Sequence, residues 1–273
     1  MKRRALLIQN PGKVGDANNV PTVAEAYNRF KSYLQSPVGG CWKDDELIEL
    51  QRLGPMGLWL QSDFVFKLRE LIQPDVDYSM IVFIGHGGAI NGVDNVQLED
   101  GELIPISYFT EIGNPKKRTV IIDACRKYEP LGAAGIVIEQ REFSGDGGYD
   151  ADACRDYYND LISHAKPHVE LLQSTQFDQY AMGSKDGTAF TDALFHVLND
   201  GHIVWKQQAL MDKYGECHKS ILDILTEINA NMATDQQVPQ YTNDSDDVFP
   251  FYAIKRPTTR IIPGGEFIQV LND

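Results

Sequence analysis

Two short stretches of the sequence decide the fold class. Residues 78–88 read YSMIVFIGHGG, and residues 118–126 read RTVIIDACR. Each contains a continuous run of apolar, largely β-branched residues, which is typical of a central strand covered on both faces. Because such strands occur mainly in parallel sheets packed between helices, the two runs predict an α/β protein.

Further strand and helix patterns alternate along the chain. Strand patterns occupy 4–9, 47–53, 169–174 and 248–254, and Pro250 favours a sheet edge for the last of these. Helical stripes occupy 22–34, 60–71, 190–198 and 221–228, the first opening with a capping box of Thr22 and Glu25. Asp100-Gly101 marks a hairpin within 96–105. This order predicts a mainly parallel central sheet of about six strands flanked by helices.

Composition limits the partners and the compartment. The 25 basic and 39 acidic residues give a net charge of −14, so neither nucleic acid nor an anionic membrane is expected as a main partner. The apolar run after the basic start ends at Gln9, which is too short for a signal peptide, and no stretch approaches the roughly 18 apolar residues of a membrane span. The four cysteines show no C-x-x-C spacing, which favours a reducing, cytoplasmic setting.

The 273 residues are expected to form a single domain with one interruption. Residues 139–160 are rich in glycine and aspartate and contain few apolar side chains, so we expect an exposed, mobile connection there. It separates residues 1–138, which carry both distinctive turns, from residues 161–273.

The candidate chemistry follows the two central strands. His86 comes after the strand ending at Ile84, and Cys125 comes after the strand ending at Ile122. Functional groups of a parallel sheet gather beyond the carboxyl ends of its strands, so the imidazole and the thiol are expected to face one crevice if the strands are neighbours. An imidazole can generate the reactive thiolate, and the N–H groups of Gly87 and Cys125 are candidate oxyanion donors. This pattern predicts acyl transfer by a Cys–His pair.

Other interpretations of the same residues remain open. A cysteine after an apolar strand is often a small buried hydrophobe, and a histidine in a turn is often a loop residue. Gly85 to Gly88 also resembles a phosphate-binding loop, but no helix pattern follows at once and no Lys-Ser/Thr pair is present.

The two turns and their order resemble the caspase and metacaspase group of cysteine peptidases. The similarity rests on Gly85-His86-Gly87, on Asp123-Ala124-Cys125-Arg126, on Ser174-Thr175 with the later stretch 184–190 (SKDGTAF), and on Gln237-Val238-Pro239-Gln240. The resemblance implies a caspase-like three-layer sandwich of a compact prokaryotic type. It makes 1–138 similar to a large subunit and 161–273 similar to a small subunit. It also implies an endopeptidase in which Cys125 is the nucleophile and His86 protonates the leaving amine.

Departures from caspases bear on specificity. Caspases have glutamine two residues before the nucleophile, where this chain has Asp123, and an arginine before the Ser-Lys-Asp-Gly stretch, where this chain has Met182-Gly183. Asp123 shares a strand face with Cys125 and would attract a cationic side chain, so we predict cleavage after Arg or Lys. Ser174 and Asp178 are weaker candidates for the same substrate-binding pocket, and each could equally be a turn residue. The competing interpretation pairs Asp123 with Arg126 or makes it a turn cap.

No cofactor is required by this chemistry, but calcium is possible. Some metacaspases bind calcium in a similar loop, whose acidic residues here are Asp94, Glu99, Asp100 and Glu102. A solvated face is the alternative for these carboxylates. His164 and His168 have a metal-chelating spacing, but Pro167 interrupts it, so we interpret both as surface residues.

Regulation and two alternative functions remain open at this point. Self-cleavage is a hypothesis for 127–160, where the basic residues are Lys127, Arg141 and Arg155. A separate activating partner is possible, and the chain could be a monomer or a dimer. The alternative functions are a catalytically inactive caspase-like scaffold and a flavodoxin-like module that binds a small anion.

Overall fold

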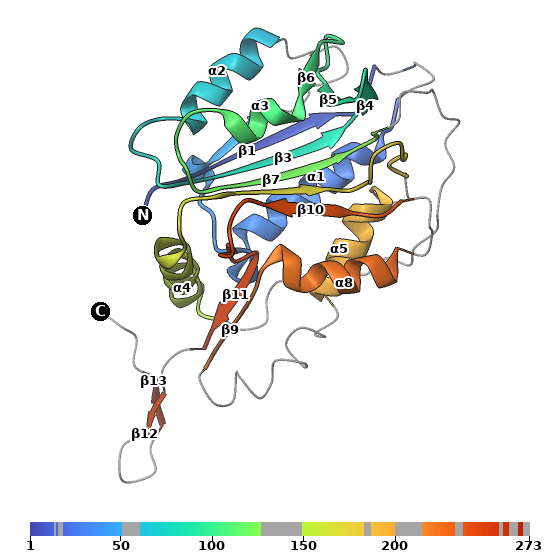
Figure 1. Ribbon diagram of the computed structural model, residues 1–273. Coiled ribbons are helices and arrows are strands. Elements are labelled where there is room, and N and C mark those ends of the chain that lie inside the picture. Colours follow the sequence, from blue (N-terminus) through green and yellow to red (C-terminus); the bar gives the residue numbers. More distant parts are fainter. Residues whose placement is uncertain are drawn as a thin grey trace.

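The central sheet has six strands in the order β10-β8-β7-β3-β1-β2 (Figure 1). A computed structural model describes residues 1–13, 15, 19–50, 61–126, 149–182, 187–199, 215–232, 237–256, 259–261 and 267–269. The strands are β1 (Arg3–Asn10), β2 (Leu47–Leu50), β3 (Tyr78–Gly85), β7 (Arg118–Ala124), β8 (Val169–Gln173) and β10 (Gln240–Asn243). Five of them are parallel and β10 runs antiparallel to β8, which confirms the α/β prediction.

Helices cover both faces of this sheet (Figure 1). The α-helices are α1 (Thr22–Gln35), α2 (Gln61–Leu71), α3 (Ile106–Glu111), α4 (Ala151–His164), α5 (Ala189–Asn199) and α8 (Ile221–Asn231). Two short 3-10 helices, η1 (Pro37–Gly39) and η2 (Asp44–Glu46), precede β2. Smaller sheets pair β4 (Gly87–Ile90) with β5 (Val93–Gln97) and β6 (Leu103–Pro105), β9 (Glu216–Lys219) with β11 (Tyr252–Lys255), and β12 (Thr259–Ile261) with β13 (Phe267–Gln269).

Alternation along the central strands builds a core on each face. Val82 and Ile121 point to the face covered by α1, α4, α5 and α8, whereas Phe83 and Ile122 point to the face covered by α2 and α3. Side chains two residues apart share a face, which is why strands buried on both sides are continuously apolar. By the same alternation Asp123 follows Ile121 toward the α5 face.

A buried arginine closes the end of the sheet opposite the carboxyl ends of the strands. Arg3 is fully buried, and its guanidinium lies 4.4 Å from the centre of the Trp42 ring. Glu46 binds both Arg3, at 3.3 Å, and Arg155 of α4, at 2.6 Å. Two cations on one carboxylate compensate its burial, because an unpaired buried charge is strongly destabilising.

The expected mobile connection is wrong for residues 151–160, which form most of helix α4. The Asp150 side chain accepts a hydrogen bond from Ala153 N–H, and Cys154, Tyr158 and Ile162 bury one stripe of the helix. Their spacing of four residues was a helix signal that the glycines and aspartates around it obscured. Residues 139–148 lie outside the described part of the chain.

Two smaller expectations also need correction, and the last predicted strand has its own sheet. That strand corresponds to β11, which is an edge strand paired only with β9 among the described residues, while β10 forms the edge of the central sheet. The capping box at Thr22 is not formed, since Thr22 is the first helical residue after Pro21 and no side-chain cap is present there. The predicted strand at 47–53 is β2 for its first four residues, and 51–53 lie outside the described residues.

His168 is not a surface residue as expected. Its side chain is almost fully buried, its ring stacks on Phe249 with 3.8 Å between centroids, and its Nε2 lies 3.4 Å from Oε1 of Glu170. His164 is exposed, as expected.

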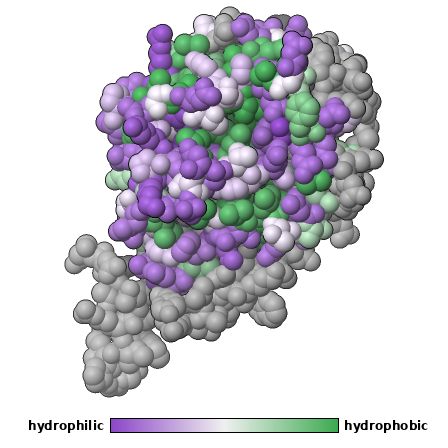
Figure 2. All heavy atoms as spheres, in the orientation of Figure 1, coloured by the Kyte–Doolittle hydropathy of each residue, from purple (hydrophilic) through white to green (hydrophobic). Residues whose placement is uncertain are grey.

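Hydrophilic residues cover much of the face shown in Figure 2, with apolar residues in patches between them. Among the residues that the structure describes, no helix combines the length and apolar character needed to cross a bilayer.

Candidate active site

His86 and Cys125 follow neighbouring strands of the central sheet. In the β3–β7 ladder Gly85 lies opposite Ala124, so the next residue on each strand is one of the two candidates. Adjacent strands are about 4.8 Å apart, and both candidates therefore lie at the same edge of the sheet. The main chain of His86 is fixed from both sides, because its N–H donates to Asn10 O at 3.3 Å and its carbonyl accepts from Gln97 N–H at 2.9 Å.

Glycine is required where the chain after His86 meets the nucleophile. A Cβ placed on Gly87 would lie 2.9 Å from Ala124 Cβ and 3.0 Å from the Cys125 carbonyl oxygen. Gly85 has φ of +152°, which L side chains rarely adopt. The Gly87 peptide therefore approaches Cys125 closely, as an oxyanion donor must, but the donor role of the Gly87 and Cys125 N–H groups stays a prediction.

The Cys125 sulfur contacts the main chain of residue 181. It accepts from Ala181 N–H at 3.3 Å and lies 3.7 Å from Ala181 O as a donor. Burial raises the pKa of the Cys125 thiol, the hydrogen bond from Ala181 N–H opposes this, and the charge of Asp123 raises the pKa further. The resting sulfur therefore favours the neutral thiol, and forming the thiolate requires a proton acceptor such as an imidazole.

Asp123 lies beneath the nucleophile and is 1% exposed. Its Oδ2 accepts from the hydroxyls of Thr188 and Thr191, the latter at 2.9 Å, whereas Oδ1 has no hydrogen-bond partner among the described residues. Burial raises the pKa of this carboxyl, and the hydroxyls of Thr188, Ser174 and Thr191 lower it in part. The structure thus brings Asp123 and Ser174 together, at the ends of β7 and β8.

The positions of Arg126 and Asp178 bear on two of the interpretations above. Arg126 does not pair with Asp123, because its guanidinium binds Asp94 and Gln240 instead. Asp178 does not join the group around Asp123. It is exposed, has φ of +61°, and lies in the turn closed by the hydrogen bond from Gln179 N–H to Gln176 O, which matches its alternative interpretation as a turn residue.

Gln237 connects these segments, a role that no local sequence pattern indicates. Gln237 is 1% exposed, and its side chain donates to Ser174 O at 3.1 Å and accepts from Met182 N–H at 2.8 Å. It thereby fixes both ends of the segment that leads from Ser174 to the contact with Cys125. The resemblance had marked residues 237–240 without giving them a role, so part of this signal was present.

The calcium candidates make several contacts within the described part of the chain. Asp94 binds the guanidinium of Arg126 at 2.6 Å, and Asp100 accepts a hydrogen bond from Glu102 N–H at 3.1 Å. Glu99 is buried. Among the described residues, no group of three or more His, Cys, Asp or Glu side chains could hold a metal ion. Calcium binding stays a prediction.

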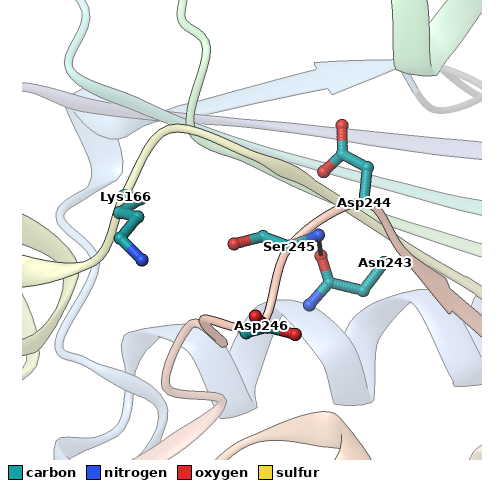
Figure 3. Close-up of a pocket in the computed structure, with 5 residues that line it drawn as sticks. All are labelled: Lys166, Asn243, Asp244, Ser245 and Asp246. Atoms are coloured by element: carbon teal, nitrogen blue, oxygen red, sulfur yellow. Dashed lines mark hydrogen bonds between the residues drawn. The ribbon is translucent and has the colours of Figure 1, made fainter.

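An open hollow lies at the opposite end of β8 from Cys125. It is lined by Lys166 and by residues 243–246, and Figure 3 shows the hydrogen bond from Ser245 N–H to Asn243 Oδ1. Its lining is polar and lies beyond the start of β8, so it is separate from the site at the carboxyl ends of the strands.

Comparison with known proteins identifies the family. A family model described as "Caspase domain" matches residues 61–250, which contain both His86 and Cys125. The chain belongs to the caspase family of cysteine peptidases. A search of curated proteins gives no match.

Solved structures show the same caspase fold. The structure is similar to caspase-1 from Spodoptera frugiperda, with 16% identity, a TM-score of 0.53 and coverage of 92% of this chain and 89% of that one. A protein from Geobacter sulfurreducens gives 13% identity and a TM-score of 0.51, covering 89% and 93%. The Drosophila initiator caspase Dronc gives 10% identity and a TM-score of 0.50, covering 91% and 82%.

Proposed function

We propose that this caspase-family chain is an endopeptidase in which Cys125 is the nucleophile and His86 is the general acid and base. The supporting observation is the β3–β7 register, which makes the two residues neighbours beyond paired Gly85 and Ala124. The Cys125 proton passes to the His86 imidazole as the sulfur bonds to the substrate carbonyl carbon. His86 then gives the proton to the departing amine as the C–N bond breaks, and water hydrolyses the resulting thioester.

We further propose that the substrate presents Arg or Lys before the cleaved bond, and that Asp123 binds this cation. Support comes from Oδ1 of Asp123, which is buried and has no hydrogen-bond partner within the described part of the chain, and from the buried Ser174 hydroxyl beside the same carboxyl. A guanidinium would supply the donors that these oxygens lack, and its charge would counter the burial that raises the pKa of Asp123. Arg126 binds Asp94, so its charge is not directed toward an acidic substrate side chain.

Labelling with electrophilic peptides tests both parts. Peptide chloromethyl ketones that differ only in a terminal Arg, Lys, Asp or Leu are incubated with the protein, and intact mass is measured. We expect an adduct at Cys125 with the basic reagents that is absent in Cys125→Ala. Asp123→Asn should lower the labelling rate with Arg at least 10-fold and leave the rate with Leu nearly unchanged.

The alternatives give different outcomes. A catalytically inactive scaffold gives no adduct with any of the four peptides, although iodoacetamide still reaches the thiol. Preferential labelling by the Asp reagent refutes the basic specificity and leaves the peptidase proposal intact. The anion-binding module loses its physical basis, because Gly85 to Gly88 lead into β4 rather than into a helix whose N-terminus could hold an anion.

We also propose self-processing in the 127–160 region, and the structure reduces the number of basic residues after which the chain could be cut. Arg155 is in α4 and binds Glu46, so a peptidase cannot reach its peptide bond without unfolding the helix. Lys127 and Arg141 lie outside the described residues and are the remaining candidates. Long incubation should give two fragments from the wild type and none from Cys125→Ala, and an intact wild-type band in active enzyme would refute the proposal.

Partners and location are proposed on general grounds. A protein or peptide substrate with a basic residue follows from the chemistry above, and a separate activating partner would act on the contacts of Ala181. A cytoplasmic location fits the four free cysteines, because a reducing compartment keeps thiols available.

A further inference from the structure

We infer that the ion pair between Arg126 and Asp94 is a positioning device that holds the His86-bearing hairpin against Cys125. This inference rests on the proposed roles of Cys125 and His86. It assigns Arg126 and Asp94 to the geometry of the pair and gives them no contact with substrate.

Arg126 connects the chain after the nucleophile to three other segments. Its Nη2 donates to Asp94 Oδ2 at 2.6 Å, and its Nη1 donates to Thr175 O at 3.0 Å and to Gln240 Oε1. Its main-chain N–H donates to Gln179 O at 2.9 Å. The side chain is 9% exposed, and five donors in a rigid plane suit a residue that fixes several segments at once.

Asp94 belongs to the hairpin that begins directly after His86. Strand β4 starts at Gly87, and Asp94 on β5 lies opposite Ala89 on β4. Strand β5 also returns to His86 itself, because Gln97 N–H donates to the His86 carbonyl at 2.9 Å. The hairpin is therefore fixed to the histidine at one end and to the residue after the nucleophile at the other.

The ion pair completes a closed loop of contacts around the two reactive groups. Within this loop Cys125 is bonded to Arg126, Arg126 binds Asp94, and the hairpin leads from Asp94 to Gly87, where an added Cβ would lie 3.0 Å from the Cys125 carbonyl oxygen. Breaking the ion pair frees the hairpin to move relative to Cys125. A shift of about 1 Å between reacting groups can lower a rate by about 100-fold.

The same contact gives Asp94 a cation of its own. A partly buried carboxylate is stabilised by a paired charge, and here the guanidinium supplies it. Added calcium, the cation first considered for Asp94, is therefore expected to act neither on the melting temperature nor on the reactivity of Cys125 through Asp94.

The test is the pH dependence of alkylation of Cys125 by iodoacetamide, in which the thiolate displaces iodide and no peptide substrate is needed. In the full chain, the other cysteines are distinguished by peptide mass mapping. The midpoint is the pH at which the alkylation rate is half its maximum. A lower midpoint in the wild type than in His86→Ala shows that the imidazole lies beside the thiol. We expect Asp94→Asn and Arg126→Gln each to raise this midpoint toward the His86→Ala value and to lower kcat/KM at least 10-fold, with the double variant no worse than the worse single variant.

The two variants separate positioning from a simple charge effect. Removing the negative charge of Asp94 should by electrostatics alone lower the alkylation midpoint, whereas removing the positive charge of Arg126 should raise it. If the ion pair positions the hairpin, both substitutions raise the alkylation midpoint. Opposite shifts would overturn the inference, as would calcium-dependent stabilisation that Asp94→Asn abolishes.

Controls exclude a general loss of stability. Arg155→Gln breaks a similarly buried ion pair, with Glu46, at the far end of the sheet, and it should lower the melting temperature without moving the alkylation midpoint. If Asp94→Asn and Arg126→Gln behave like this control, the ion pair is only structural and the inference fails. If the wild type shows the His86-dependent midpoint but cleaves no peptide, the proposed peptidase function fails while the positioning role stands. If His86→Ala leaves the midpoint unchanged, both fail.

Discussion

Replacing Gly87 with alanine measures how tightly the histidine turn is packed against the nucleophile. The added Cβ would lie 2.8 Å from Asn95 O, 2.9 Å from Ala124 Cβ and 3.0 Å from Cys125 O, where ordinary contacts begin at 3.4 Å. The turn must therefore move by roughly 0.5 Å, because all three neighbours are main-chain or Cβ atoms that cannot rotate away. Overpacking of this kind costs about 1–3 kcal/mol of folding free energy.

The displacement of the turn should reduce catalytic activity more than the loss of folded protein alone would reduce it. We expect kcat/KM for an Arg peptide to fall about 10- to 100-fold at a temperature where the variant is fully folded. Gly92→Ala is the matched control in the same hairpin, because its Cβ meets no atom within 4 Å although its φ of +79° is unfavourable for alanine. It should cost about 1–2 kcal/mol and leave kcat/KM nearly unchanged. Activity of Gly87→Ala within threefold of wild type would refute the close approach.

Three further substitutions test buried groups. Burial alone would raise the pKa of Glu46, but its two arginine partners lower it to about 2. The ionised carboxylate therefore stabilises the fold above pH 4.5, and this contribution is lost as the pH falls toward 2. In urea titrations at several pH values, Glu46→Gln should remove about 3 kcal/mol of the pH-dependent free energy of unfolding. Burial lowers the pKa of His168, but hydrogen bonds to Glu170 and to a carbonyl raise it on balance. The contribution of protonated His168 to stability is therefore complete below pH 6.5 and is lost as the pH rises through the raised pKa. In His168→Gln, the melting temperature should depend less on pH above 6.5 than it does in the wild type. Thr191→Val removes a hydroxyl that lowers the pKa of buried Asp123, so the acid limb of kcat/KM for an Arg peptide should move to higher pH, and an unmoved limb would argue against Asp123 as the cation ligand.

The central strands were predictable because their signal is local. The apolar runs at 78–84 and 119–122 are continuous, and they correspond to β3 and β7 at the centre of the sheet. Strand β10 was missed because its residues, 240–243, are mostly polar and half of them are exposed, as suits a short edge strand. Helix α4 was missed because Asp150 begins a helix at the end of a segment whose composition indicates a loop.

The sequence predicts only those site residues whose positions are determined by the ends of the strands. His86, Cys125 and Asp123 could be chosen because each belongs to or follows a strand that the sequence reveals, and parallel strands bring their ends together. The hydroxyls that bind Asp123 come from residues 65 and 68 positions later, and Asp94 is 32 positions from Arg126. Such pairings depend on how helices and hairpins pack on the sheet, which no local pattern encodes.

The contact between Cys125 and Ala181 has a consequence for how a substrate enters. Both main-chain hydrogen-bonding groups of Ala181 already contact the sulfur, so under the proposed function an arriving peptide would exchange with a resident stretch of main chain. The net gain in binding free energy would then be the difference between two similar sets of hydrogen bonds, and selectivity would depend on the substrate side chain proposed to reach Asp123. The proposed basic side chain would then supply a favourable contact with Asp123 that the main chain at Ala181 does not make.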